Sequence, residues 1–150
     1  MISTDVLEHI EHDKNAFNCL AKFVRPSGQI LITVPAGQWL FGYHDEQLGH
    51  YRRYSAGTAR QMVSDTCRVR RVRYFGTTLI PVCLLFSQWL RKPYPVAEVG
   101  GDKRSLISRI LNTLLALEKR IHFPLGTSLL LCAERKRTTG QSTLALRSAA

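Results

Sequence analysis

The stretch QILITVP, residues 29–35, limits the folds open to this chain more than any other segment. From Ile30 to Val34 it is a run of large apolar and β-branched residues in which Thr33 is the one polar interruption. Before it, residues 13–24 place apolar side chains on one face of a helix, and a Pro-Ser-Gly turn connects the two segments. A helix followed by a short, continuously apolar strand is one half of an α/β crossover. The sequence therefore predicts an α/β fold with a parallel strand covered on both faces.

The remaining segments predict further elements of the same domain. Residues 36–54 have no clear period and predict a long loop, and Ser55 is a candidate N-cap for a helix that ends near Asp65. We also expect Asp13 or Asn15 to accept backbone N–H bonds where the first helix begins. The other predicted segments are a strand at 68–76, an apolar helix at 78–91, a loop at 92–103, a helix at 105–121 and a strand at 127–136. One domain at 1–137 and a disordered tail at 138–150 are expected.

Charge and cysteine content restrict the function classes. The chain has 150 residues and a net charge of +10, but residues 1–50 contain only three Lys/Arg against six Asp/Glu. The excess of cations in the rest favours anionic partners, although no nucleic-acid motif organises it. The four cysteines form no CxxC pair and are expected to be reduced and mostly buried. No signal sequence is recognisable and the apolar run 79–86 is too short to span a bilayer, so we expect a cytoplasmic location.

The segment DVLEHIEHD, residues 5–13, concentrates titratable side chains near the start of the sequence. Its candidate metal ligands are Glu8, His9, Glu11, His12 and Asp13. In a helix, however, Glu8 would pair with His12, and His9 with Asp13 on a different side, so four ligands would not converge. We therefore predict no metal site here, and interpret the segment as the junction between a strand and a helix.

Three motifs, in order, carry a family resemblance. Asp5, Leu7, Glu8 and His9 form a D-x-L-E-H segment, Arg25-Pro26-Ser27-Gly28 forms a K/R-P-x-G turn, and residues 33–35 read T-V-P. Together with HDEQLGHYRRYS at 44–55, they resemble the second half of a class I S-adenosylmethionine-dependent methyltransferase, including a bacterial subgroup with H-D-x-x-x-G-H-x-R-R-Y. The motifs span residues 1 to about 76.

The resemblance implies a cofactor and a fold. The fold would be a partial Rossmann-like sheet, strands 4–7 with flanking helices, whose first three strands are missing. Asp5, Val6 and Leu7 would line the methionine end of the S-adenosylmethionine pocket, largely through the backbone, although Val6 and Leu7 could simply be strand core. The family's G-x-G-x-G turn is absent, since none of the ten glycines forms G-x-G. We therefore expect a fragment that is inactive or incomplete by itself.

The resemblance also implies where the methyl acceptor binds. His9, His44 and His50 are candidate general bases, because the pKa of a histidine lies near neutral pH. Glu8, Asp45, Arg52, Arg53 and Tyr54 are candidate substrate-binding residues; the arginines could clamp a phosphate or carboxylate. Two alternatives remain open: His9 could instead bond the loop after residue 35, and the 44–54 cluster could be an internally hydrogen-bonded loop that anchors a lid to the sheet.

A second function class is compatible with the same sequence. The run RVRRVRYF at 68–75 and the cations near the C-terminus could form a non-catalytic basic module for nucleic acid or an anionic surface. Expected partners are thus a small-molecule or anionic acceptor, with nucleic acid less favoured and no transmembrane span. A strand that ends at Asp5 would also expose an unpaired sheet edge, through which two copies could dimerise.

Overall fold

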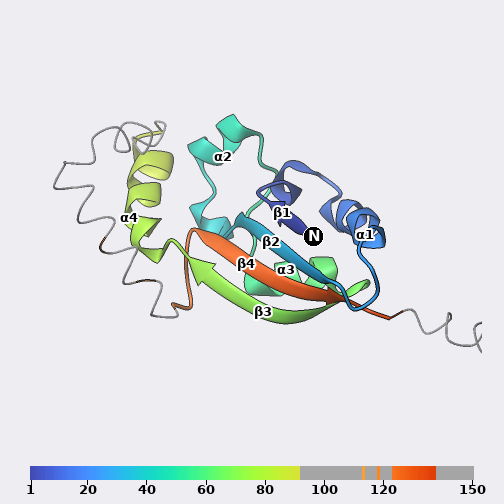
Figure 1. The fold of residues 1–150 in the computed structure, drawn as a ribbon. Coiled ribbons are helices and arrows are strands. Elements are labelled where there is room, and N and C mark those ends of the chain that lie inside the picture. The colour runs from blue at the N-terminus through green and yellow to red at the C-terminus, as the bar shows by residue number, and fades with distance from the viewer. Residues whose placement is uncertain (92–112, 114–117, 119–122, 138–150) are drawn as a thin grey trace, which may run out of the picture.

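The computed structural model describes residues 1–91, 113, 118 and 123–137 of the chain, and has an α/β fold (Figure 1). Its strands are β1 (Ile2–Thr4), β2 (Gln29–Pro35), β3 (Cys67–Phe75) and β4 (Ser128–Arg135). Its α-helices are α1 (Asp13–Lys22), α2 (Tyr43–Leu48), α3 (Ala56–Val63) and α4 (Ile80–Cys83). Short helical turns η1 (Leu7–His9), η2 (Gln38–Leu40) and η3 (Thr77–Leu79) and the π-helix η4 (Leu84–Trp89) complete the described elements.

The four strands form one open, mixed sheet in the order β1-β2-β4-β3. β1 pairs in parallel with β2, as the sequence predicts, while β4 lies antiparallel between β2 and β3. The last strand of the described chain is therefore in the middle of the sheet, and β2 and β3 run in the same direction on either side of it. The carboxyl ends of β1 and β2 consequently meet at one end of the sheet.

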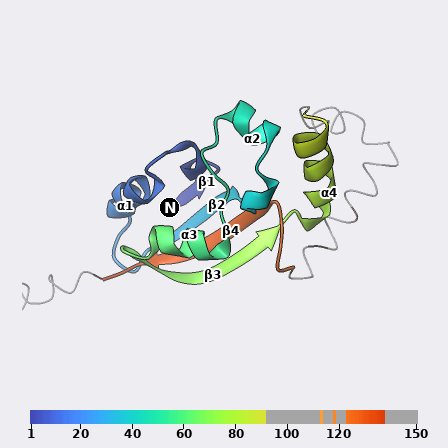
Figure 2. The same ribbon diagram turned by 180° about the vertical axis from the view of Figure 1, so that it is seen from behind.

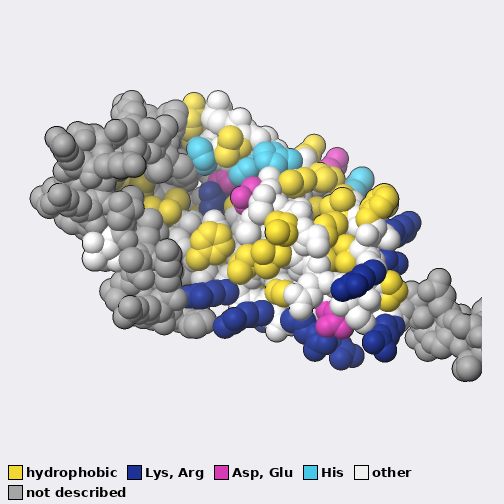
Figure 3. Space-filling view, viewed as in Figure 1, with side chains coloured by type: hydrophobic (Ala, Val, Ile, Leu, Met, Phe, Trp, Pro, Cys, Tyr) yellow, Lys and Arg dark blue, Asp and Glu magenta, His cyan; other side chains and the backbone are white. Residues whose placement is uncertain are grey.

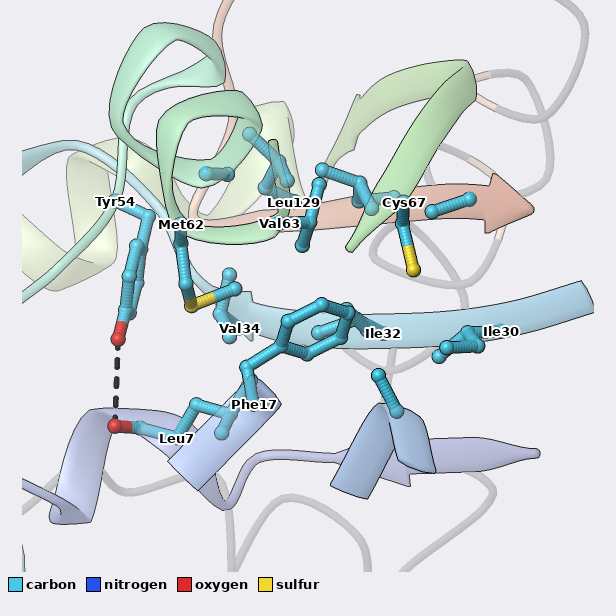
Figure 4. Packing of buried hydrophobic residues seen from close by; sticks show 14 of the residues in the cluster. Leu7, Phe17, Ile30, Ile32, Val34, Tyr54, Met62, Val63, Cys67 and Leu129 are labelled. Carbon is cyan, nitrogen blue, oxygen red and sulfur yellow. Dashed lines mark hydrogen bonds between the residues drawn. The ribbon is translucent and has the colours of Figure 1, made fainter. Parts of the chain in front are cut away.

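The core lies between the sheet and two helices on one of its faces. Figure 2 shows α1 and α3 in front of the strands, and the two helices contact each other. Phe17 of α1 and Met62 of α3 pack over Ile32 and Val34 of β2, as Figure 4 shows. The prediction that β2 is covered on both faces is wrong in part, because Ile30, Ile32 and Val34 are buried while Leu31 and Thr33 on the other face are half-buried.

The turn from α1 into β2 explains its Pro-Ser-Gly sequence. Ser27 has a φ of 61°, in the left-handed region, and Gly28 follows it at a tight approach. A Cβ on Gly28 would lie 2.7 Å from Val24 Cγ1 and 2.8 Å from the Arg25 carbonyl oxygen. Only glycine fits there without a shift of the helix end, so the turn fixes where β2 begins.

Several local predictions are confirmed. Ser55 caps α3, its Oγ accepting a bond of 3.1 Å from the Thr58 N–H. Asp13 accepts the Lys14 N–H at 2.7 Å, although it is the first residue of α1 rather than the residue before it. The strands predicted at 68–76 and 127–136 correspond to β3 and β4. All four cysteines are free thiols, but Cys19 is exposed and Cys132 only half-buried, so burial is less general than predicted.

The helical region after β3 is shorter and less regular than a single helix. The predicted apolar helix at 78–91 consists of η3, α4 and η4 in succession. Among the described residues, no helix is both long enough and apolar enough to cross a membrane. The predicted loop at 92–103 and the tail at 138–150 lie outside the described residues, as does the predicted helix at 105–121 apart from two of its positions.

Candidate functional site

Two loops form a site at the carboxyl ends of β1 and β2. The loop after β1 starts at Asp5, whose N–H donates to the Thr33 carbonyl at 3.0 Å and whose φ is 50°. The loop after β2 returns to the sheet at Tyr54, whose N–H donates to the Pro35 carbonyl at 2.8 Å. The two loops are joined directly, because the Tyr51 N–H donates to the Glu8 carbonyl at 2.8 Å. Residues more than forty positions apart are thereby held side by side.

Asp45 is the centre of the loop that follows β2. Its side chain is completely buried, on the first turn of α2, and accepts the Gly42 N–H at 3.1 Å. Asp45 Oδ1 also lies 2.8 Å from His50 Nδ1. Gly49, with a φ of 71°, ends α2 and turns the chain so that His50 comes back beside its own helix. The sequence did not predict α2, and this short helix is what aligns Asp45 with His50.

Arg53 completes this cluster from the other side. Its Nε donates to both Asp45 oxygens, at 2.8 and 2.9 Å, and its Nη1 donates to the Ala36 carbonyl at 3.4 Å. The residue is only 7% exposed, so the ion pair is shielded from water. These hydrogen bonds join residues within the loop after β2, as the alternative of an internally hydrogen-bonded loop requires. A role of Arg53 in substrate binding stays a prediction.

Glu8 is buried beside this cluster without a hydrogen-bond partner. Its exposed fraction is 0%, and neither carboxylate oxygen has a donor among the described residues. Burial raises the pKa of Glu8, and the nearby charge of Asp5 raises it as well, while its own backbone amide, His50 and His9 act in the opposite direction. Since buried polar groups are nearly always hydrogen-bonded, this carboxylate is the least satisfied group described in the site.

The two histidines nearest Glu8 contact each other. The rings of His9 and His50 are edge to face, with centroids 4.6 Å apart and planes at 79°. His9 is exposed, whereas the His50 side chain is only 9% exposed. Figure 3 shows histidine side chains gathered next to acidic ones on the face of the molecule near α2. His9 thus contacts the loop after residue 35 by ring packing against His50, whereas the alternative predicted from the sequence was a bond to that loop.

His44 belongs to the same helix, α2, but makes a different connection. Its backbone N–H donates to Ser87 Oγ at 3.2 Å, which ties α2 to η4. Burial lowers the pKa of the His44 ring, and Arg53 contributes in the same direction, against the opposing charge of Asp45. His44 is therefore biased towards the neutral form, in which an imidazole can accept a proton.

Tyr54 and Arg52 face the beginning of α1 instead. The Tyr54 hydroxyl donates to Asp13 Oδ2 at 2.8 Å and lies 3.3 Å from the Leu7 carbonyl. Burial and the bond to Asp13 raise the pKa of Tyr54 well above its usual range, so the phenol stays neutral. Arg52 lies 3.2 Å from Asp13 Oδ1 and donates to the Glu11 carbonyl at 2.6 Å. Both residues line a cleft of ≈ 380 Å³.

The three residues predicted to line a cofactor pocket differ in exposure. Asp5 is exposed and Val6 is 44% exposed, while Leu7 is fully buried in the core cluster. The side chain of Leu7 is therefore core, as one of the sequence-based alternatives has it. Only the backbone of Leu7, with Asp5 and Val6, is available at the carboxyl end of β1.

Comparisons with known proteins do not assign a family. No family model matches this sequence, and no curated protein matches it. The sheet and the site geometry show an α/β fold with a cluster of titratable residues at the carboxyl ends of two parallel strands. Any particular chemistry for that cluster is consequently a proposal.

Proposed function

We propose that the chain takes part in S-adenosylmethionine-dependent methyl transfer and supplies the acceptor side of the site. The observation that carries this proposal is the position of the cluster. Ligands of open α/β sheets bind outside the carboxyl ends of parallel strands, and the D-x-L-E-H and H-D-x-x-x-G-H-x-R-R-Y segments meet there. These are two of the segments that carry the sequence resemblance.

The residues at the end of β1 fit one wall of a pocket for this cofactor. Asp5 and Val6 are exposed at the carboxyl end of the strand, and Asp5 has a left-handed φ of 50° where the chain leaves it. No described residue supplies a glycine turn of the G-x-G-x-G type. The chain therefore offers contacts to the methionine end, and the pocket needs a second wall to bind the ribose and adenine.

The cluster around Asp45 supports proton transfer from the acceptor. The cofactor, when bound, supplies an electrophilic methyl group, whose C–S bond breaks as the acceptor's lone pair attacks the methyl carbon. If the acceptor is a hydroxyl group, its proton must leave. Asp45 holds His50 through Nδ1, which leaves the lone pair of Nε2 as the basic atom. The buried Asp45 also stabilises the imidazolium that forms.

Photolabelling locates the proposed cofactor contact directly. The chain would be joined to an upstream segment with a G-x-G-x-G turn and irradiated with S-adenosylmethionine that carries a radioactive methyl group. We expect the label in the peptide that contains Asp5, Val6 and Leu7. Excess S-adenosylhomocysteine should suppress this labelling. Labelling confined to peptides outside residues 1–12, or labelling that the competitor leaves unchanged, would contradict the proposal.

The alternative, a basic module that binds nucleic acid, has one observation in its favour. Arg68, Arg70 and Arg71 are exposed on β3, and Figure 3 shows cations along the edge of the sheet. One of these cations, Arg70, and Lys136 just after β4 already have partners, however. Arg70 Nε donates to Glu134 at 2.8 Å, and Lys136 Nζ donates to the Ser64 carbonyl at 2.6 Å. Binding of single-stranded DNA that falls by orders of magnitude between about 50 and 200 mM salt would favour this alternative.

A further inference from the structure

The buried carboxylate of Glu8 requires a partner that the described residues do not provide. Both of its oxygens are inaccessible to water and lack hydrogen-bond donors. Leaving a buried acceptor unsatisfied costs about 1–3 kcal/mol, and more for a charged group. A carboxylate in such a place is stable when a cation or a proton lies against it. Two neighbours of Glu8 offer nitrogen ligands for such a cation.

These two neighbours are imidazole rings. One carboxylate oxygen of Glu8, one ring nitrogen of His9 and one of His50 all lie within 4.8 Å of one another. Ligand atoms bound at about 2.0–2.2 Å to one tetrahedral ion are about 3.4 Å apart. Since His9 is exposed, a rotation of its ring can bring its nitrogen from this separation to the spacing that a bound ion requires, without disturbing the core.

The surroundings of His50 are those of a metal-binding histidine. A histidine that binds a metal through one nitrogen usually donates its other N–H to a carboxylate, which fixes the tautomer and the direction of the ring. His50 Nδ1 has that partner in Asp45 at 2.8 Å, and Asp45 is in turn held by Arg53. The nitrogen left to bind an ion is Nε2.

We propose that Glu8, His9 and His50 bind a divalent transition-metal ion, with Asp45 as the residue that positions His50. Two imidazoles and one carboxylate suit zinc, iron(II) or cobalt(II) better than magnesium or calcium, which prefer oxygen ligands. Three protein ligands leave coordination positions open for water or for an oxygen of a small molecule. A mononuclear site with an open face follows.

This site stands on the geometry alone and does not depend on methyl transfer. Where both hold, the ion takes the lone pair of His50 Nε2, and it replaces this histidine as the group that makes an acceptor hydroxyl nucleophilic. It does so by lowering the pKa of the oxygen that it binds. The proton then leaves to solvent or to another base, and no oxidation is involved.

The test is a titration of the 150-residue chain with cobalt(II) under reducing conditions, followed by absorption spectroscopy. We expect one ion to bind with visible d–d bands and without a strong thiolate charge-transfer band, because the ligands are nitrogen and oxygen. A thiolate band would instead place the ion on a cysteine such as the exposed Cys19 and would overturn the proposal. So would the absence of saturable binding up to millimolar cobalt.

Variants identify the ligands. His50→Ala and Glu8→Gln should each weaken cobalt binding at least tenfold, and Asp45→Asn should weaken it about 10- to 100-fold, as expected for a group that orients a ligand. His12→Ala is the matched control, since His12 is an exposed histidine in the same segment but outside the cluster, and its affinity should equal that of the wild type. If Asp45→Asn does not fold, His9→Ala replaces it, because His9 is exposed. Unchanged affinity in His50→Ala, or a loss in His12→Ala as large as in His50→Ala, would contradict the assignment.

Discussion

The hydroxyl of Tyr54 joins the loop after β2 to the start of α1, and its removal gives a measurable loss of stability. Tyr54 is 1% exposed, and its hydroxyl bonds to Asp13 Oδ2 at 2.8 Å and faces the Leu7 carbonyl at 3.3 Å (Figure 4). Tyr54→Phe keeps the ring and removes only these polar contacts. The change therefore isolates the energy of the hydroxyl group.

The expected loss follows from the charge and exposure of the partners. A hydrogen bond to a charged group contributes roughly 1.5–3 kcal/mol. Asp13 is partly exposed at 15% and keeps Lys14 and Arg52 as partners, so the lower part of that range applies, about 1.5–2 kcal/mol. For a domain of this size, at about 2–4 °C per kcal/mol, the melting temperature should fall by about 3–8 °C.

Urea unfolding followed by far-UV circular dichroism measures this loss. The matched control is Tyr51→Phe, because Tyr51 is 55% exposed. The control should change the free energy of unfolding by less than about 0.5 kcal/mol, as surface substitutions usually do. A Tyr54→Phe variant as stable as the control would refute the argument that the Tyr54 hydroxyl holds the two loops together.

Three further predictions concern other parts of the fold. Gly126→Ala places a Cβ 2.4 Å from a backbone carbonyl oxygen of β3, so it should lower the free energy of unfolding by about 1–3 kcal/mol. The control Gly57→Ala, in the open part of α3, should raise it by roughly 0.5–1 kcal/mol. Equal effects of the two variants in thermal unfolding would contradict the packing at the start of β4. Arg53→Ala leaves Asp45 buried without its cation and should lower the free energy of unfolding by about 3–5 kcal/mol, and a loss under about 1 kcal/mol would show that the pair is dispensable. The pKa of His44 is lower in the folded chain than its unfolded value near 6.5, so the unfolded state binds more protons at this residue. The free energy of unfolding should therefore fall as the pH drops from about 7.5 to 5.5. Urea midpoints measured at both pH values should fall less in His44→Gln than in the wild type.

The parts of the fold that the sequence predicted depend on signals between near neighbours. The apolar run of β2, the turn that requires Gly28 and the Ser55 cap are each read within a few residues, and all three have the expected structure. The covering of β2 was predicted less well, because an unbroken apolar run does not reveal that α1 and α3 pack on the same face. The one-sided covering of β2 becomes visible only in the structure, where alternate residues of the strand are buried.

The site was predicted as a set of residues but not as a geometry. Helical spacing pairs Glu8 with His12 at i+4. That pairing holds only in a regular helix, and the segment forms the short turn η1 instead. The group that faces Glu8 is His50, far along the chain, and it arrives there through the unpredicted helix α2 and the left-handed Gly49. Contacts of this kind depend on the path of a loop, for which the sequence carries no periodic signal.

Calorimetric titration with S-adenosylmethionine tests the proposed function most directly. The chain offers one wall of the pocket, and the missing bonds to a ribose carboxylate and to backbone N–H groups contribute roughly 1.5–3 kcal/mol each where charge is involved. At about tenfold per 1.4 kcal/mol, their absence lowers the affinity a hundredfold or more. We predict no measurable binding by the 150-residue chain at micromolar concentration, and clear binding once it is joined to a segment with a G-x-G-x-G turn. Micromolar affinity of the chain alone, or no binding by the joined protein, would contradict the account.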